Sequence, residues 1–429
     1  MSGHLSRSIL ASFLRAPKDS YTTLDYSRFS NEQFLFILNG LSGIAPYSHE
    51  FVAISQDPQM VSGLVSALTS FMKELSGTTP ARWKTEYGPD TTLMVEVGEW
   101  AMGVLVVKRE TGEARSMLRR VVNEFEDSFA VLRDADGIEG GLFAEFDQFV
   151  RRTFVGDRLS KRTVILKGYD WCDTSTLCES PRWSYEMRKL LIEVDDKKTL
   201  AEARAVLKTS LEEVTELVSR ALWYRFIYVV LVPSDNDMLM LSEGAGSYLL
   251  DAHNPRGLSA ATLKIIGALD GRSSLFRLLS KLRLRDNEDM LIELGLLTNE
   301  GFVQRVTLER KLVLVNECIL TSMLNKYSRI IVAKTVREYL ERAIVRTIVR
   351  TPWAARIVCS RGFKVTCRLD EGLQISDLNQ VSDALEAVQR NMALLISQVD
   401  NSESTESIYR DAMTLCREVW GSDLRDLIV

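Results

Sequence analysis

Residues 34–51 read FLFILNGLSGIAPYSHEF, and this stretch is the most informative part of the sequence about the N-terminal fold. The unbroken apolar run at 34–38 predicts a buried strand, and the pairs Asn39-Gly40 and Ser42-Gly43 predict a turn. Residues 44–51 predict the next strand, in which Pro46 marks an edge or a first position because proline cannot donate a ladder hydrogen bond. The stretch therefore predicts two adjacent strands that open a sheet.

The elements that follow extend this pair of strands into an α+β domain over residues 31–155. A helix is expected at 59–75, because apolar side chains recur every three or four residues at Met60, Leu64, Leu68 and Phe71. We expect this apolar stripe to pack on the sheet. Further strands are expected at 83–87, 91–97 and 101–108, and further helices at 116–133 and 142–154. This order predicts an antiparallel five-stranded sheet with helices packed on it.

The strands at 34–51 followed by MVSGLVSALTSF at 60–71 resemble the longin/roadblock-like domains of archaeal proteins. Those domains open with a hairpin and continue into a helix of the form SGLxxAxxSF. The resemblance covers roughly residues 31–150 and brings no catalytic residue with it. It implies an archaeal type of protein, a capacity to form a homodimer, and binding or regulation of a small Ras-like GTPase.

After residue 155 the sequence pattern predicts a basic linker at 156–184, followed by two similar units. Residues 185–250 and 257–318 share one order: a helix, an Asp-centred turn, a helix, a turn, a helix and a two-stranded wing. Each unit resembles a winged helix-turn-helix domain. The expected wings are the strand pairs 225–232 with 238–241, and 302–308 with 312–315. Residues 1–30 are polar and irregular and predict an N-terminal arm.

Residues 327–429 predict a small α+β C-terminal module that begins with a long basic helix at 329–350 and continues with a hairpin and two helices. Residues 327–364 carry nine Lys or Arg against only Glu338 and Glu341. Such a surface suits nucleic acid, an anionic membrane or an acidic partner, although a solvated helix with Arg side chains covering its own core is equally compatible. The candidate basic interaction face consists of Arg329, Arg337, Arg342, Arg346 and Arg350.

The composition of the chain argues against several classes of protein. Its 429 residues are 46% hydrophobic and 26% charged, which excludes a disordered chain and predicts two to four domains. Six cysteines do not form a disulfide framework or a zinc spacing, so a reducing, cytoplasmic setting is expected. No apolar run approaches the ~20 residues of a membrane span. With three histidines, no phosphate loop and no nucleophile elbow, we expect no enzyme, metal or cofactor.

Two functions remain open at this point. The favoured hypothesis is a non-catalytic regulatory adaptor that binds a protein partner, because the third helix of each unit is acidic and would repel phosphates. Those acids are Glu212, Glu213 and Glu216 in the first unit, and Glu288, Asp289 and Glu293 in the second. The alternative is a DNA-binding transcriptional regulator whose longin-like domain senses or dimerises. Its candidate anion contacts are Arg272, Arg277, Lys281, Arg283 and Arg285.

Overall fold

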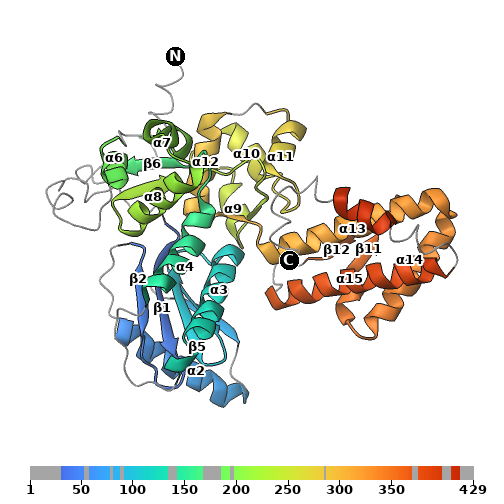
Figure 1. The fold of residues 1–429 in the computed structure, drawn as a ribbon, viewed down its shortest axis with the longest axis horizontal. Coiled ribbons are helices and arrows are strands. Elements are labelled where there is room, and N and C mark those ends of the chain that lie inside the picture. The colour runs from blue at the N-terminus through green and yellow to red at the C-terminus, as the bar shows by residue number, and fades with distance from the viewer. Residues whose placement is uncertain are drawn as a thin grey trace. The chain divides into compact units, whose positions relative to one another are not determined.

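The computed structural model describes residues 30–52, 58–77, 81–86, 91–133, 143–167, 185–193, 198–284, 287–369, 375–398 and 407–415. Figure 1 shows the course of the chain. It divides into two compact units, Met1–Arg305 and Val306–Val429. The expected polar arm lies outside the described residues, apart from Ser30.

The first unit begins with a five-stranded antiparallel sheet, as the sequence predicts. Its strands lie in the order β2-β1-β5-β4-β3. They are β1 (Glu32–Asn39), β2 (Tyr47–Glu50), β3 (Arg82–Glu86), β4 (Thr92–Val97) and β5 (Ala101–Val107). Strand β1 is buried along its whole length, because it lies inside the sheet and both of its faces are covered.

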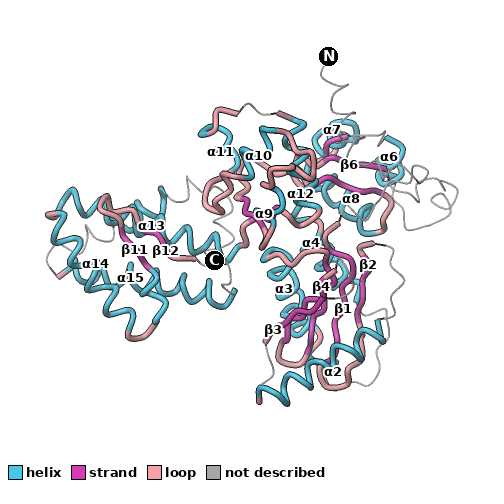
Figure 2. Tube along the Cα trace, turned by 180° about the vertical axis from the view of Figure 1, so that it is seen from behind, coloured by secondary structure: helices cyan, strands magenta, loops and turns pink. Residues whose placement is uncertain are grey.

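Helices cover both faces of this sheet (Figures 1 and 2). Alternate side chains of β1 point to opposite faces. Phe34 and Phe36 pack with Val61 and Val65 of α2 (Pro58–Ser76). On the other face lie α3 (Gly112–Ser128), a short 3-10 helix η2 (Ala130–Leu132) and α4 (Ala144–Phe154). The N-terminal domain is therefore a three-layer α+β structure.

The prediction for the inner face of α2 is only partly correct. Val61 and Val65 are buried on the sheet, whereas Met60 is 76% exposed and Leu64 is 44% exposed. A helix packed on a sheet buries a stripe roughly 100° wide, so an apolar surface wider than that stripe leaves side chains in solvent. Met60 and Leu64 follow one another at a four-residue spacing on the exposed side.

The segment expected as a linker contributes regular structure. It contains a 3-10 helix η4 (Gly156–Arg158) and strand β6 (Val164–Lys167). Strand β6 is the centre of a three-stranded sheet, between β7 (Lys198–Thr199) and β8 (Ile227–Val230). Residues 168–184 lie outside the described residues.

Two sets of three helices follow, named here the two repeats. The first contains α6 (Tyr185–Glu193), α7 (Leu200–Leu207) and α8 (Leu211–Trp223). The second contains α10 (Ala260–Ile266), α11 (Leu275–Lys281) and α12 (Glu288–Asn299), and the short helix α9 (Ala245–Leu249) precedes it. Strands β9 (Leu239–Leu241) and β10 (Val303–Arg305) flank the second repeat.

The predicted wings are wrong in their pairing. Strand β8 pairs with β6, and β10 pairs with β9, so the strand after each set of helices pairs with the strand before it. Residues 312–315, expected as a strand, lie within helix α13 (Leu308–Ile330). The prediction was wrong because it paired strands that are close in the sequence, whereas the observed partners are separated by a set of three helices.

The same backbone hydrogen bonds occur in both three-helix repeats, at positions about 75 residues apart in the sequence. Thr199 caps α7 and Ser274 caps α11, each through its side chain. The first residue of each helix donates a backbone hydrogen bond to a residue just before the flanking strand: Leu200 to Thr163, one residue before β6 (2.9 Å), and Leu275 to Asp237, two residues before β9 (2.8 Å). Positive φ angles also recur in pairs, at Lys208 and Arg283 (56° and 52°) and at Arg225 and Gly301 (63° and 75°). The repeats therefore share one backbone plan.

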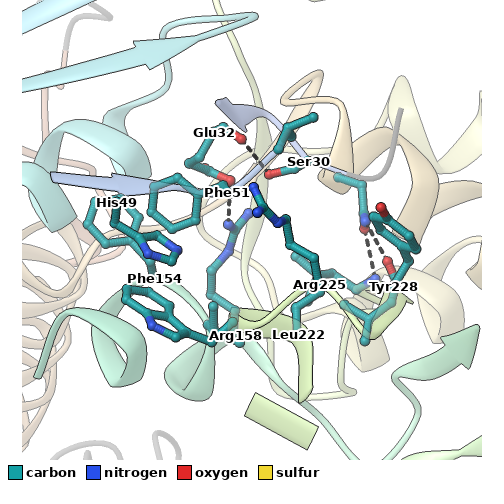
Figure 3. Close-up of a pocket in the computed structure, with 15 residues that line it drawn as sticks. Ser30, Glu32, His49, Phe51, Phe154, Arg158, Leu222, Arg225 and Tyr228 are labelled. Atoms are coloured by element: carbon teal, nitrogen blue, oxygen red, sulfur yellow. Dashed lines mark hydrogen bonds and ion pairs between the residues drawn. The ribbon is translucent and has the colours of Figure 1, made fainter. Parts of the chain in front are cut away.

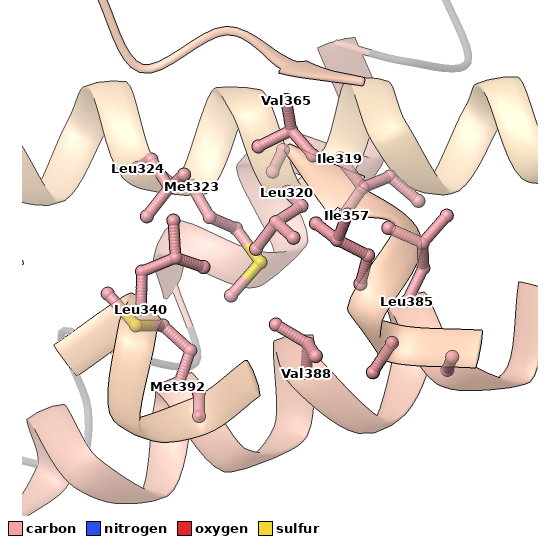
Figure 4. Close-up of a cluster of buried hydrophobic side chains, with 14 of the residues drawn as sticks. Ile319, Leu320, Met323, Leu324, Leu340, Ile357, Val365, Leu385, Val388 and Met392 are labelled. Atoms are coloured by element: carbon pink, nitrogen blue, oxygen red, sulfur yellow. The ribbon is translucent and has the colours of Figure 1, made fainter. Parts of the chain in front are cut away.

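The second unit contains α13, α14 (Ala333–Ile348), a 3-10 helix η6 (Pro352–Arg356), the hairpin β11 (Ile357–Cys359) and β12 (Val365–Cys367), and α15 (Ile375–Ser397). Residues 407–415 are also helical. Figure 4 shows its core, in which Leu320 and Met323 of α13 lie near Leu340, Val388 and Met392.

The predicted hairpin in this unit is confirmed, but the single helix at 329–350 is wrong. Helix α13 ends at Ile330, and the chain is extended at Ile331, with φ −116° and ψ 148°. Helix α14 then starts at Ala333. Three β-branched residues in a row, 330–332, disfavour a continuous helix because their side chains restrict χ1 and crowd the preceding turn.

Candidate functional site

The five arginines of the candidate basic face have different environments in the structure. Arg329 is exposed near the end of α13, whereas Arg337, Arg342 and Arg346 belong to α14. Arg337 is used within the unit: its Nη2 donates to the carbonyl of Arg361 (3.0 Å), and its guanidinium lies over the Phe363 ring. Arg342, Arg346 and Arg350 are exposed. The exposed part of the face therefore consists of Arg329 at the end of α13 and of Arg342, Arg346 and Arg350, on the C-terminal half of α14 and just beyond it.

Helix α12 is not free to enter a DNA groove. All its residues from Met290 to Asn299 are buried. Glu293, expected on an exposed acidic face, is 3% exposed and accepts hydrogen bonds from the backbone N–H and hydroxyl of Ser259 (3.1 and 2.9 Å) and from the Thr262 hydroxyl. This carboxylate therefore holds the start of α10, which corrects its predicted role.

Helix α8 retains part of its predicted acidic surface. Glu212 and Glu213 are exposed. Glu216 instead pairs with Arg151 of α4 and with Arg220 of its own helix, both at 2.7 Å. Hydrogen bonds from Ser210 at the helix start lower the pKa of Glu213. One side of α8 therefore lies against α4. Two of its acids stabilise local structure: Glu216 by ion pairs, and Glu213 by accepting a hydrogen bond at the start of the helix.

The candidate DNA contacts gather only in part. Arg277 and Lys281 are exposed on α11, and Arg283 is exposed in the turn that follows. Arg272 lies in the turn before α11, where its backbone N–H donates to Asp270 (2.8 Å). Arg285 lies outside the described residues. Helix α11 has two turns, so these side chains form a small cationic surface rather than a groove.

A buried charged pocket joins the sheet domain to the first repeat, and the sequence did not predict it (Figure 3). Its cavity has a volume of about 50 Å³ and is lined by residues of β1, β2, η4, α8 and β8. Arg158 reaches Glu32 (3.0 Å) and Glu113 (3.4 Å). Burial alone would lower the pKa of Arg158, but these two carboxylates raise it. This cluster fixes η4 against the start of β1 and α3.

His49 and Trp223 form the aromatic side of the pocket. Their rings stack at 3.4 Å with an interplanar angle of 6°. Burial, and then the charge of Arg225, lower the pKa of His49 to about 3. Arg225 is in turn paired with Glu50 at 3.1 Å. A neutral, stacked imidazole with such a pKa is suited to packing and not to proton transfer near neutral pH.

Polar contacts also join the second repeat to the sheet domain. Gln304 of β10 accepts hydrogen bonds from the backbone N–H groups of Gly112 (2.7 Å) and Glu113 (3.3 Å) at the start of α3. The Glu113 carboxylate accepts from the N–H of Arg305 (3.1 Å). Both repeats are thus attached to the sheet domain by buried or half-buried polar groups whose pairing could not be predicted from the sequence.

No protein-family model matches the sequence, and no curated protein matches it. In the described part of the chain, no group of three or more His, Cys, Asp or Glu side chains could hold a metal ion. No helix there is long and apolar enough to cross a bilayer.

Proposed function

We propose that this protein is a non-catalytic adaptor whose N-terminal domain is a longin/roadblock-like protein-binding module. The observation that carries the proposal is the exposed apolar side of α2. Met60 is 76% exposed and Leu64 is 44% exposed, and Ala67 on the same side is exposed too. Adjacent apolar side chains in solvent are typical of a surface that another protein covers. A second copy of the chain is the partner we propose for this face.

We also infer that the two repeats are winged-helix-like modules that serve as rigid protein-interaction parts and not as DNA readers. The burial of α12 supports this, since a recognition helix must be accessible to reach base edges. The acidic exposed side of α8 would oppose phosphate binding. The small cationic surface of α11 and the basic stretch at 327–364 favour the alternative, a DNA-binding regulator.

Light scattering on the full chain tests the pairing. We expect a dimer that Leu64→Asp converts to a monomer, because a charge at the centre of an apolar interface must be desolvated. The matched control is Ser70→Asp, an exposed position on another side of α2, which should leave the dimer intact. A wild-type monomer at high concentration, or equal effects of the two variants, would contradict the proposal.

A small Ras-like GTPase is the second partner we propose for the N-terminal domain, on the resemblance alone. A pulldown against the host's small GTPases loaded with GDP or a GTP analogue tests it. We expect binding that depends on the nucleotide. Absence of binding in both states would remove this partner and leave the adaptor proposal to the light-scattering result.

A further inference from the structure

The C-terminal half of α14 exposes a set of apolar side chains. Val345 is 63% exposed, Val349 is 83% exposed and Ile348 is 36% exposed. Their spacing of three and four residues places them on one side of the helix. The opposite side, with Leu340, Ala343 and Thr347, is buried in the core of the second unit. The exposed side is therefore a second apolar surface on a helix whose core contacts are already satisfied.

Positive charge predominates on one side of this surface, while the exposed Glu341 lies one turn before Val345 and the exposed Glu338 one turn before Arg342. From Arg342 to Arg368 the sequence has no Asp or Glu but seven basic residues: Arg342, Arg346, Arg350, Arg356, Arg361, Lys364 and Arg368. Arg356 is used internally, since its Nη1 donates to the carbonyl of Arg368 (3.1 Å). Among the described residues, no ion pair involves Arg342, Arg346 or Arg350. The end of α14 therefore places exposed arginines beside exposed valines, a combination suited to binding a partner that is both apolar and acidic.

We propose that this surface, composed of Arg342, Val345, Arg346, Ile348, Val349 and Arg350, binds an acidic amphipathic helix of a partner protein. Apolar side chains of such a helix would cover Val345 and Val349, and removing this apolar surface from water would stabilise the complex. Its carboxylates would meet the arginines at the edge, where Arg is favoured because its planar fork matches a carboxylate. Charge complementarity would also select the partner and speed its association.

The apolar side chains favour an acidic protein helix over other anions. Contacts to a phosphate backbone use cations and hydrogen-bond donors, so nucleic acid would leave Val345 and Val349 uncovered. A membrane-surface helix inserts a broad apolar face that commonly carries Trp or Phe. Here the apolar surface is three branched side chains, and nearby Trp353 donates its Nε1–H to Gln380 (2.5 Å).

Fluorescence anisotropy on the full chain tests this proposal. The probe is a labelled 20-residue peptide with Leu at a three- and four-residue spacing and Glu on the other positions. A control peptide has the same composition in scrambled order. We expect micromolar binding of the first peptide and at least tenfold weaker binding of the second, because only the first presents an apolar stripe.

Variants locate the site. Val345→Asp and the double change Arg342→Glu with Arg346→Glu should each weaken peptide binding at least tenfold, whereas Arg329→Glu, on α13, should leave it unchanged. All these side chains are exposed, and unchanged circular dichroism would verify folding. Equal binding of the two peptides would overturn the proposal, as would an Arg329→Glu effect as large as the others. Binding only to vesicles of anionic phospholipid, or only to duplex DNA, would also overturn it.

Discussion

The two repeats share one backbone plan, yet their third helices differ in how much of their surface is covered. Both helices expose acids in the first turn, Glu212 and Glu213 in α8 and Glu288 in α12, but beyond that turn α8 is buried along one side, whereas α12 is buried at every position from Met290 to Asn299. The close approach of α12 to β8 explains the difference: a Cβ at Gly295 would lie 2.7 Å from Val230 and 3.1 Å from the backbone of Val232. The two repeats therefore have the same backbone arrangement, and the elements packed around each third helix determine how much of that helix stays exposed.

The last residues of these helices show the same contrast. Trp223 ends α8 and stacks on His49 of the sheet domain. Asn299 ends α12 and bonds to the first repeat: its Oδ1 accepts from the N–H of Leu231 (2.8 Å), and its Nδ2 donates to the carbonyl of Val229 (2.6 Å). One position thus makes an aromatic contact in one repeat and a polar contact in the other.

Truncation at both positions should give the largest effects. We expect Trp223→Ala to lower the free energy of unfolding by about 3–5 kcal/mol through loss of a large buried ring. Asn299→Ala should lower it by about 2–3 kcal/mol, because two buried backbone groups lose their partner. Denaturant titration measures both, with exposed Tyr224→Ala as the control. An effect of Trp223→Ala no larger than that control would show that the stacked pair does not stabilise the junction.

Acid should weaken the junction on the His49 side. Because the pKa of His49 is about 3 in the folded chain and about 6.5 when unfolded, the unfolded state binds the extra proton between these values. This contribution to stability is therefore constant above pH 6.5 and is lost as the pH falls. At pH 4.5 the loss is about 3 kcal/mol, from two pKa units at about 1.4 kcal/mol each.

The matched variant His49→Phe keeps an aromatic ring and removes the titrating group. Its free energy of unfolding should vary less between pH 7 and pH 4.5 than that of the wild type. Melting curves at several pH values measure the difference. Identical pH profiles for the two proteins would mean that His49 is accessible to protons in the folded state.

The smallest effect is expected where the repeats agree. Lys208 and Arg283 occupy the same place after the second helix of each repeat, both with positive φ. Replacing either by Gly relieves a left-handed conformation, which should stabilise the protein by about 0.5–1 kcal/mol at each site. Thermal melting of Lys208→Gly and Arg283→Gly measures this. Opposite signs at the two sites would argue against a shared backbone plan.

Periodicity along the sequence predicted much of the fold. The strands around 34–51 and the helices that cover the sheet could be read from it, since a half-buried strand or helix repeats its apolar side chains at a fixed spacing. The partners of β8 and β9 could not be read, because pairing depends on strands far apart in the chain. The ends of α13 and α14 were missed because an apolar spacing persists across the break at 331–332.

The candidate sites divide in a similar way. The sequence located the cationic stretch that contains Arg342 and Arg346, because charge is a property of composition. It could not indicate that Arg337 is used by the hairpin, or that Glu32 and Glu113 pair with Arg158. Those pairings bring together side chains from elements that are distant in sequence.

Local spacing and composition are enough to predict the five-stranded sheet and the location of positive charge. Which apolar sides of α2 and α14 stay in solvent, and which acids are buried, depends on the folded chain, because burial requires two surfaces that meet. A helix is amphipathic by its own sequence, but the sheet or helix that it meets decides which of its apolar side chains is covered.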